Sequence, residues 1–217
     1  MILPIVAAVA TGWAVRKFFG QAQRLDLAKF PEPKAQFAAK VYNAAFEPCK
    51  AAGVPLSLAL AQAAVETGWG RAVPGGNLYG LKGKGPAGTV NVPTKEEGAP
   101  GEIVRIRDNF RAFNNWQESV AAWCRYVTAP RNRPPVSRPS AASWLVWYWS
   151  QGYATSSRYP FAVAAVSRSV ASKLGKPDLA ITLGGPIAGL AEQLSQVDPK
   201  ARQAMARQYA ATKGWPA

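Results

Sequence analysis

The stretch VPLSLALAQAAVETGWGRAVPGGNLYGLKG, residues 54–83, decides how this chain folds. Its first half is almost entirely small and apolar, which predicts a buried helix that starts at Pro55 and ends at Gly68. Glu66 is the charged exception, in the last turn of this helix. Gln62 lies one turn earlier, so both side chains share one helix face.

The position of Glu66 predicts a carboxyl group with a raised pKa. Loss of hydration and the negative end of the helix dipole both disfavour its ionised form. A carboxylic acid that stays protonated is what protonation of a glycosidic oxygen requires. An ordinary surface glutamate at a helix end is the more common case, so the residue pattern alone leaves both interpretations open.

The composition of the 217-residue chain excludes several classes of site. There is no histidine, which removes Ser-His-Asp and Cys-His catalysis and the usual zinc sites that contain histidine. Cys49 and Cys124 lie far apart in apolar helical contexts and form no metal motif, so we expect two buried thiols, with a disulfide as the alternative. We therefore predict no metal and no cofactor.

The charge balance indicates a polyanionic partner. Twenty-six Lys and Arg against twelve Asp and Glu give a net charge of +14. Such a field attracts nucleic acid, anionic lipid or an acidic cell wall. The basic residues are spread from Arg16 to Lys213 without a dense run, so we predict no specific nucleic-acid partner.

Periodicity predicts a mostly α fold, with a helical lobe, a small β-hairpin lobe and helical extensions at both ends. Gly-rich and Pro-rich segments separate the elements. Besides the helix that ends at Gly68, we expect helices over 35–53, 116–127, 141–151, 160–174 and 187–212, strands at 89–92 and 102–106, and a turn at 98–101.

Three segments are predicted along the chain. Residues 1–34 form an apolar N-terminal segment and a linker, residues 35–175 form the main domain, and residues 176–217 form a C-terminal helical extension. The first fifteen residues carry no side-chain charge but match neither a secretory signal nor a spanning helix. We expect a short helix there, buried in a membrane, on a partner, or on the protein's own core.

Two blocks carry a resemblance to a known family. Glu66-Thr-Gly-Trp-Gly70, followed by Asn77-Leu-Tyr-Gly-Leu-Lys82, resembles the family 73 glycoside hydrolases. These are bacterial and phage N-acetylglucosaminidases related to the flagellar peptidoglycan hydrolase domain. The segments 109–119 and 152–159 agree with the family in order and spacing, although Ser156-Ser157 stands where the family has Asp-Pro. The resemblance covers about residues 35–175.

The resemblance implies a lysozyme-like fold and a set of site residues. Glu66 corresponds to the general acid, and Glu96, in Thr94-Lys95-Glu96, to a second carboxylate on the hairpin. Glu97 and Glu102 are close enough in sequence to take that second role instead. Inverting attack by water and assistance from the substrate's N-acetyl group both stay open. The substrate-binding residues implied are Tyr153, which faces the catalytic glutamate in the family, Asn77, Tyr79, Gln62 and Trp69. The matched position of Trp69 suggests support of the catalytic loop more than a platform for the sugar.

The function implied is hydrolysis of β-1,4 bonds in the glycan strands of peptidoglycan by an endo-β-N-acetylglucosaminidase. A lytic transglycosylase or muramidase is the alternative within the same class. A catalytically inactive wall-binding component of a phage or envelope assembly is the alternative from another class. The expected location is the cell envelope or a phage virion, with residues 1–20 as the contact with a membrane or a virion protein.

Overall fold

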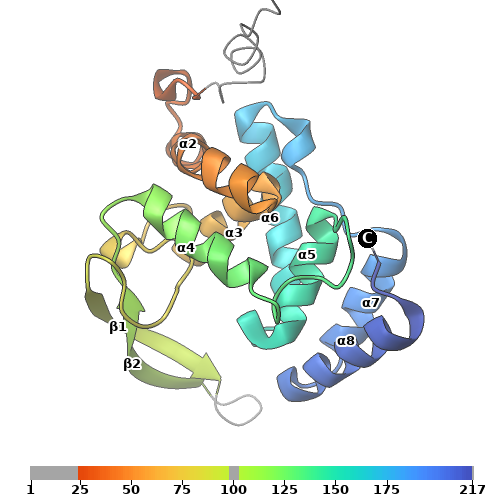
Figure 1. Cartoon of the computed structure of the whole chain (residues 1–217). Coiled ribbons are helices and arrows are strands. Elements are labelled where there is room, and N and C mark those ends of the chain that lie inside the picture. Colours follow the sequence, from red (N-terminus) through yellow and green to blue (C-terminus); the bar gives the residue numbers. More distant parts are fainter. Residues whose placement is uncertain (1–23, 98–102, 217) are drawn as a thin grey trace, which may run out of the picture.

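The computed structural model describes residues 24–97 and 103–216; the side chains of residues 94–97 and 103–105 are outside the description. The chain forms a helical body from which a two-stranded hairpin projects (Figure 1). This arrangement confirms the mostly α fold with a small hairpin lobe. The elements are η1 (Leu27–Lys29), α2 (Pro33–Ala52), α3 (Leu56–Thr67), η2 (Pro74–Gly76), β1 (Thr89–Glu97), β2 (Ile103–Arg111), α4 (Trp116–Thr128), α5 (Ala141–Tyr148), η3 (Trp149–Tyr153), α6 (Tyr159–Leu174), η4 (Pro177–Leu179), α7 (Gly185–Ser195) and α8 (Pro199–Lys213).

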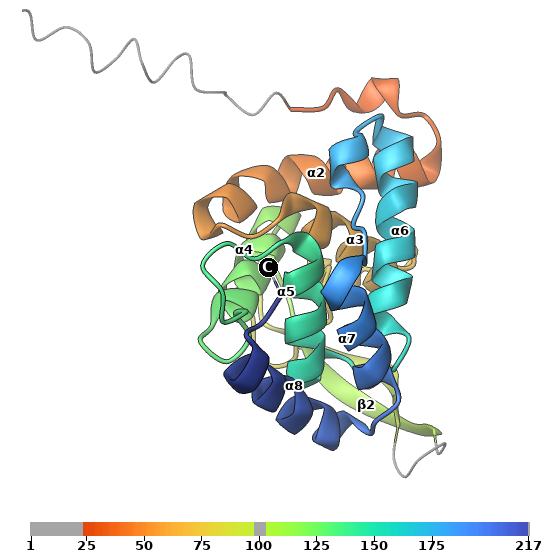
Figure 2. The same ribbon diagram turned by 90° about the vertical axis from the view of Figure 1, so that its right-hand side faces the viewer.

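Helix α3 is the centre of the helical body. Most of its residues are buried, and α2, α5 and α6 pack around it (Figure 2). Its alanines allow these neighbours to approach closely, because a methyl group takes little space between helix backbones. Pro55 precedes the helix as its N-cap, and Gly68 ends it in the left-handed conformation, as predicted.

The hairpin is longer than predicted. Strands β1 and β2 pair antiparallel from Thr89 opposite Arg111 to Glu97 opposite Ile103. The predicted strands covered only the apolar alternation at 89–92 and 102–106. Backbone pairing extends beyond it, because ladder hydrogen bonds need no apolar side chain. The turn predicted at 98–101 lies outside the described residues.

Helix α5 contributes three large aromatic side chains to the core. Trp144, Trp147 and Tyr148 are all buried. The helix ends at Tyr148 rather than at residue 151 and continues as the π-helical segment η3. Gly152 interrupts this segment with a φ of +92°, which a glycine adopts without steric cost.

The C-terminal extension contains two helices, where one was predicted over residues 187–212. Asp198 caps α8 by accepting the backbone N–H groups of Lys200 and Ala201, so a new helix starts at Pro199. The pair α7–α8 lies beside α5 and η3 (Figures 1 and 2). The apolar face of α7 is buried, at Ile187, Leu190 and Leu194.

The described part of the predicted linker packs against the helical body. The Asn43 side chain of α2 accepts the Leu25 N–H (2.7 Å) and donates to the Leu25 carbonyl (2.9 Å). Residues 1–20, predicted to contact a membrane or a partner, lie outside the described residues. Within the described ranges, no helix is long and apolar enough to span a bilayer.

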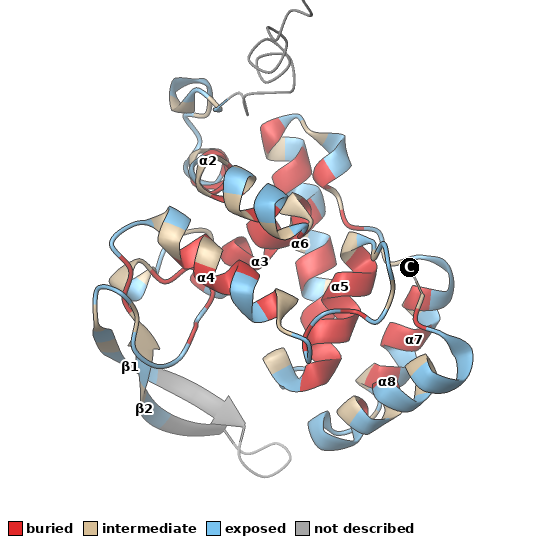
Figure 3. Ribbon diagram, viewed as in Figure 1, coloured by how far each residue is buried: buried red, intermediate tan, exposed pale blue. Residues whose placement is uncertain are grey.

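Buried and exposed residues separate cleanly in the helical body (Figure 3). The buried residues gather where α3, α5 and α6 meet, whereas the outer side of α8 is mostly exposed. Cys49 and Cys124 lie within this core as free thiols, with their Sγ atoms 3.9 Å apart. The prediction of two buried thiols is confirmed.

Candidate active site

The Glu-Thr-Gly-Trp-Gly segment forms a left-handed turn at the C-terminal end of α3. Gly68, Trp69 and Gly70 have φ angles of +58°, +63° and +81°. This conformation costs free energy at a bulky residue such as Trp69 and persists where surrounding contacts enforce it. The Thr67 hydroxyl supplies such contacts, because it donates to the Ala63 carbonyl (2.6 Å) and accepts the Gly70 N–H (2.9 Å). The chain that follows the helix is therefore held in one conformation.

Packing against α2 explains the last glycine of the segment. A Cβ atom on Gly70 would lie 2.4 Å from Cδ2 of Phe37, closer than side chains pack. Trp69 is half-buried against the hydrophobic core, and Nζ of Lys34 lies 5.8 Å from its ring centroid. Of the two roles predicted for Trp69, this packing favours support of the catalytic loop.

Glu66 is accessible to solvent but has a desolvated carboxyl group. The residue is exposed, yet surrounding protein removes enough hydration to raise the pKa of the carboxyl above its ordinary value. The Tyr159 hydroxyl donates to Oε1 of Glu66 at 2.8 Å and partly offsets the rise. The predicted direction of the pKa shift is confirmed.

The loop after the helix is organised by Asn77 and passes beside Glu66. The Asn77 amide donates to the carbonyls of Leu81 (2.9 Å) and Arg111 (3.1 Å), and its Oδ1 accepts the Leu81 N–H (3.1 Å). This buried network fixes the loop to β2. Gly80 lies next to Glu66, since a Cβ atom on it would be 3.8 Å from Oε2.

Three of the predicted substrate-binding side chains are buried. Asn77, Tyr79 and Gln62 are 4%, 1% and 0% exposed, which does not agree with direct side-chain contact to a sugar. Tyr79 stacks on Trp123 with ring centroids 4.8 Å apart, and Gln62 accepts the Tyr148 hydroxyl at 2.8 Å. A small loop and an alanine-rich helix bring these side chains into the core, where they support the site from behind.

Tyr153 lies near Glu66, and its hydroxyl is directed to a backbone carbonyl. This hydroxyl donates to the Tyr79 carbonyl (2.8 Å), whereas the Tyr159 hydroxyl donates to Glu66. The two tyrosine rings lie 5.7 Å apart in one aromatic cluster, and Tyr153 is close enough to Glu66 for the two groups to interact electrostatically. The substrate-binding role of Tyr153 stays a prediction. No role was predicted for Tyr159, because an irregular turn separates it from Tyr153 and helical spacing does not indicate its direction.

Residues 42–172 match the family described as Glucosaminidase, mannosyl-glycoprotein endo-β-N-acetylglucosaminidase. The match covers more than half of the chain and includes Glu66, Tyr153 and Tyr159. The chain belongs to the glucosaminidase family. The family predicted from the two motif blocks is thereby confirmed.

Curated relatives of this glucosaminidase-family chain are peptidoglycan hydrolases. FlgJ of Escherichia coli (strain K12) is 33% identical over 116 residues, which cover 49% of this chain and 37% of FlgJ. FlgJ of Vibrio parahaemolyticus is 31% identical over 164 residues, which cover 67% of this chain and 50% of that protein. The chain thus spans half or less of the length of these relatives.

Solved structures share the glucosaminidase-family fold. A peptidoglycan hydrolase mutant from Sphingomonas sp. A1 has a TM-score of 0.57 at 24% identity, covering 65% of this chain and 98% of that one. The catalytic domain of the autolysin Auto from Listeria monocytogenes has a TM-score of 0.54 at 22% identity, covering 69% and 88%. The likeness shows the fold, and the predicted lysozyme-like architecture is confirmed.

The second predicted carboxylate lies on the hairpin. Glu96 pairs with Val104 and Glu97 with Ile103 in the register of β1 and β2. The side chains of both glutamates, and all of Glu102, lie outside the described residues. The assignment of Glu96 therefore stays a prediction.

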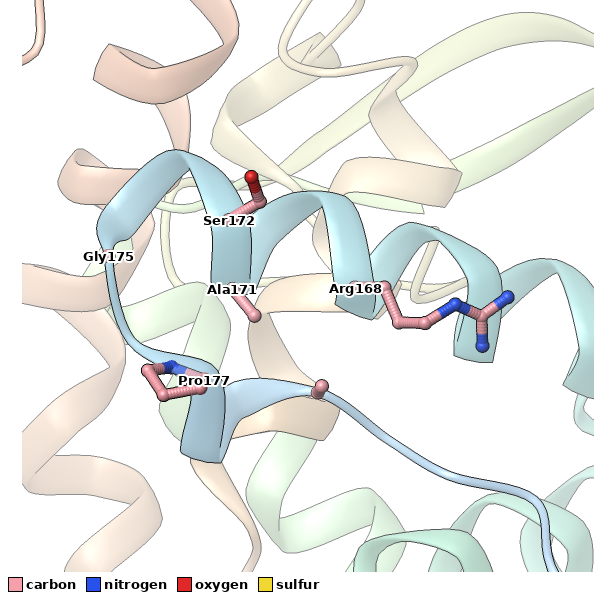
Figure 4. Close-up of a pocket in the computed structure, with 6 residues that line it drawn as sticks. Arg168, Ala171, Ser172, Gly175 and Pro177 are labelled. Carbon is pink, nitrogen blue, oxygen red and sulfur yellow. The ribbon is translucent and has the colours of Figure 1, made fainter.

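A pocket of about 420 Å³ lies away from Glu66, at the C-terminal end of α6 (Figure 4). Tyr159 is at the opposite end of this helix, about 13 Å from Arg168 by helical rise. The lining of the pocket contains no carboxyl group, so we assign it no part in the chemistry. It is lined by Arg168, Ala171, Ser172, Gly175, Pro177 and Ala180.

Proposed function

We propose that this chain hydrolyses β-1,4 glycosidic bonds in the glycan strands of peptidoglycan, as an endo-β-N-acetylglucosaminidase. The observation that carries the proposal is the Glu66 carboxyl, which has a raised pKa and is oriented by Tyr159 in a chain of the glucosaminidase family. The curated relatives named above are peptidoglycan hydrolases. The net charge of +14 suits an acidic wall polymer as substrate.

In this proposal, Glu66 is the general acid. Its Oε1 accepts the Tyr159 hydroxyl, which leaves Oε2, beside Gly80, as the atom that holds the proton. Partial desolvation keeps that proton bound at a pH where an ordinary glutamate has lost it. Transfer of the proton to the glycosidic oxygen releases the leaving sugar as an alcohol.

We propose Glu96 as the second carboxylate, which activates a water molecule or stabilises the positive charge that develops on the sugar. Comparison of Glu96→Gln with Glu97→Gln tests this assignment, because the two variants remove the same charge from adjacent positions of β1. We expect Glu96→Gln to lose at least tenfold in kcat, about 1.4 kcal/mol of barrier, and Glu97→Gln to lose little. Full activity of Glu96→Gln would end the two-carboxylate mechanism.

The products of cleavage test the proposed activity. Purified sacculi are digested with wild type, Glu66→Gln and the matched control Glu47→Gln, an exposed position on α2, and the fragments are analysed by mass spectrometry. We expect new reducing ends at N-acetylglucosamine from wild type and Glu47→Gln, and none from Glu66→Gln. Anhydro-muramyl ends would indicate a lytic transglycosylase, and reducing muramic acid ends a muramidase. No release by folded wild type from several kinds of wall would favour a binding component.

We further propose that residues 1–20 attach the enzyme to a membrane or to a virion protein at the cell envelope. The support is the uncharged apolar stretch at 1–15, followed by Arg16 and Lys17. A chain that lacks residues 1–20 should lose co-sedimentation with anionic vesicles or with the virion and keep its activity on soluble glycan. Unchanged sedimentation together with lost activity would contradict this role.

A further inference from the structure

Arg202 of α8 is an arginine buried at 2% exposure. Its guanidinium carbon lies 4.0 Å from the ring centroid of Trp149, in a cation–π contact. Burial of a guanidinium group costs free energy unless its N–H donors have acceptors. The acceptors of Arg202 therefore identify the segments of the chain that it holds in place. Nε donates to the Leu194 carbonyl of α7 at 3.2 Å, which joins the two C-terminal helices.

Nη1 and Nη2 of Arg202 donate to the turn between η3 and α6. Nη1 donates to the carbonyls of Ala154 and Thr155, and Nη2 to that of Thr155, each at 3.3 Å. The Trp149 indole holds the next residue, because its Nε1 donates to the Ser156 carbonyl at 2.9 Å. Two successive carbonyls of this turn are therefore held by Arg202 of α8, and the third is held by Trp149 of η3, whose ring Arg202 contacts.

This turn connects the two site tyrosines. Tyr153 precedes it and donates to the Tyr79 carbonyl, and Tyr159 follows it and donates to Glu66. Only five residues separate the two tyrosines, so a shift of the turn would displace both hydroxyls. The Glu66 contact depends on the placement of this short segment.

A second contact from α8 reaches the start of the same region. Gln151 of η3 is buried, and its Oε1 accepts Nε2 of Gln203 (3.3 Å) and Nε of Arg207 (3.2 Å). From the other side, Nη2 of Arg131 donates to the Gln151 carbonyl at 2.9 Å. The segment that leads into Tyr153 is thus held between α8 and the loop after α4.

We propose that Arg202 is a positioning residue of the active site, which sets the contact between Tyr159 and Glu66 by holding the carbonyls of Ala154 and Thr155. Helix α8 lies outside residues 42–172, the part of the chain that matches the family. The C-terminal extension is therefore a functional part of this catalytic domain. The inference rests on the proposed function only for the role of Glu66 as the acid.

The protonation of Glu66 reports whether the contact is in place. Tyr159 lowers the pKa of the carboxyl by its hydrogen bond. The other described titratable groups that interact with Glu66 are the buried phenols Tyr148 and Tyr153, which are uncharged near neutral pH because burial raises their pKa values. Weakening the Tyr159 contact should therefore raise the pKa of Glu66.

The first experiment is an NMR titration of the full-length protein with ¹³C-labelled glutamate, in which the Glu66 signal is assigned with Glu66→Gln. The variants are Arg202→Ala, Tyr159→Phe as the reference for a lost contact, and Arg168→Ala as the control. Arg168 is an exposed arginine of α6, nine residues beyond Tyr159, and its loss changes the net charge equally. We expect the Glu66 pKa of Arg202→Ala to move upward, toward the Tyr159→Phe value, and that of Arg168→Ala to match wild type.

Two results would overturn the proposal. In the first, Tyr159→Phe raises the Glu66 pKa but Arg202→Ala leaves it unchanged. In the second, Tyr159→Phe does not raise the Glu66 pKa. If Arg202→Ala does not fold, Arg202→Lys and Arg202→Gln replace it. Lysine keeps the positive charge and glutamine keeps an amide donor, but neither has the planar guanidinium group. We expect an upward shift of the Glu66 pKa in both variants, smaller in Arg202→Lys. An unshifted pKa in both of these folded variants would also overturn the proposal.

Activity on sacculi provides the second measurement. We expect Arg202→Ala to lower kcat about tenfold or more with little change in KM, because displacement of a catalytic group slows the chemical step. A reduced melting temperature with unchanged kcat would show a purely structural role and contradict the inference. Absence of products from wild type would count against the proposed function alone, since the titration needs no substrate.

Discussion

The Tyr159 hydroxyl donates a 2.8 Å hydrogen bond to Oε1 of Glu66, across a separation of 93 residues. The bond joins the first turn of α6 to the last turn of α3. It stabilises the ionised carboxylate, whereas desolvation, the larger effect, stabilises the protonated acid. The balance of these two effects sets the pH range in which Glu66 can donate a proton.

Removal of the Tyr159 hydroxyl should shift the pH dependence of activity. Tyr159→Phe takes away the bond that lowers the Glu66 pKa, so the alkaline limb of the kcat profile should move to higher pH. We expect kcat at the optimum to fall about tenfold, because the acid loses its orientation. The measurement is kcat on soluble glycan across the pH range. Tyr42→Phe, a tyrosine of the α2 core, is the control, and a shift in both variants would contradict the assignment.

Replacement of Glu66 by Gln should stabilise the fold at neutral pH. The folded-state pKa lies above the ordinary value of 4.5, so the folded protein holds its proton more tightly than the unfolded chain. The stability contribution of this group is thus fully present below about pH 4.5 and is lost as the pH rises through the folded pKa. Urea unfolding should show Glu66→Gln to be more stable than wild type at pH 7 and equal to it in acid. Glu47→Gln is the control for the loss of one carboxylate. A Glu66→Gln variant that is less stable than wild type at pH 7 would be evidence against desolvation of the Glu66 carboxyl.

The close contact of Gly70 with Phe37 predicts a large cost of substitution. Gly70→Ala combines a φ of +81° with a Cβ atom 2.4 Å from the Phe37 ring, so we expect it to destabilise the protein by about 3 kcal/mol or more. Gly53→Ala is the matched control, because Gly53 has a φ of +65° with nothing within 4 Å of the added Cβ. It should cost about 1 kcal/mol. If Gly70→Ala and Gly53→Ala lower the free energy of unfolding equally, in thermal or urea unfolding, the contact with Phe37 does not contribute to the cost.

The two cysteines should be unreactive in the folded protein. Cys49 and Cys124 are buried free thiols, so a polar thiol reagent should modify neither within minutes and both in denaturant. Absorbance of the released thiol counts the reactive cysteines. Fast labelling of one native cysteine would show that the packing between α2 and α4 opens readily.

Much of the fold could be predicted from local pattern. The apolar run before Glu66 predicted α3, because a helix that packs on several sides contains few polar residues. Gly68 and Pro55 marked its ends through their backbone preferences. The direction of the Glu66 pKa shift could also be predicted, because a carboxyl group at the end of an apolar helix is expected to lose hydration.

Two predictions of element bounds were wrong for different reasons. The continuation of the hairpin beyond Val92 depends on pairing with β2, a distant segment. The break between α7 and α8 is marked locally by Asp198-Pro199, so this signal was available in the sequence. The contact between Tyr159 and Glu66 was not predicted, because the turn between Tyr153 and Tyr159 has no repeating geometry from which the direction of each hydroxyl could be inferred.

The sequence by itself determined most of the helical elements and the family, and it singled out Glu66 as the candidate acid, because these depend on contacts within a few residues or on a contiguous motif. Tertiary structure alone decided that Tyr159 contacts Glu66, that Asn77, Tyr79 and Gln62 are buried, and that Arg202 of α8 holds the turn between the tyrosines. The physical reason is that these contacts join residues tens of positions apart. Their geometry is set by how whole helices pack, which no local pattern of residues encodes.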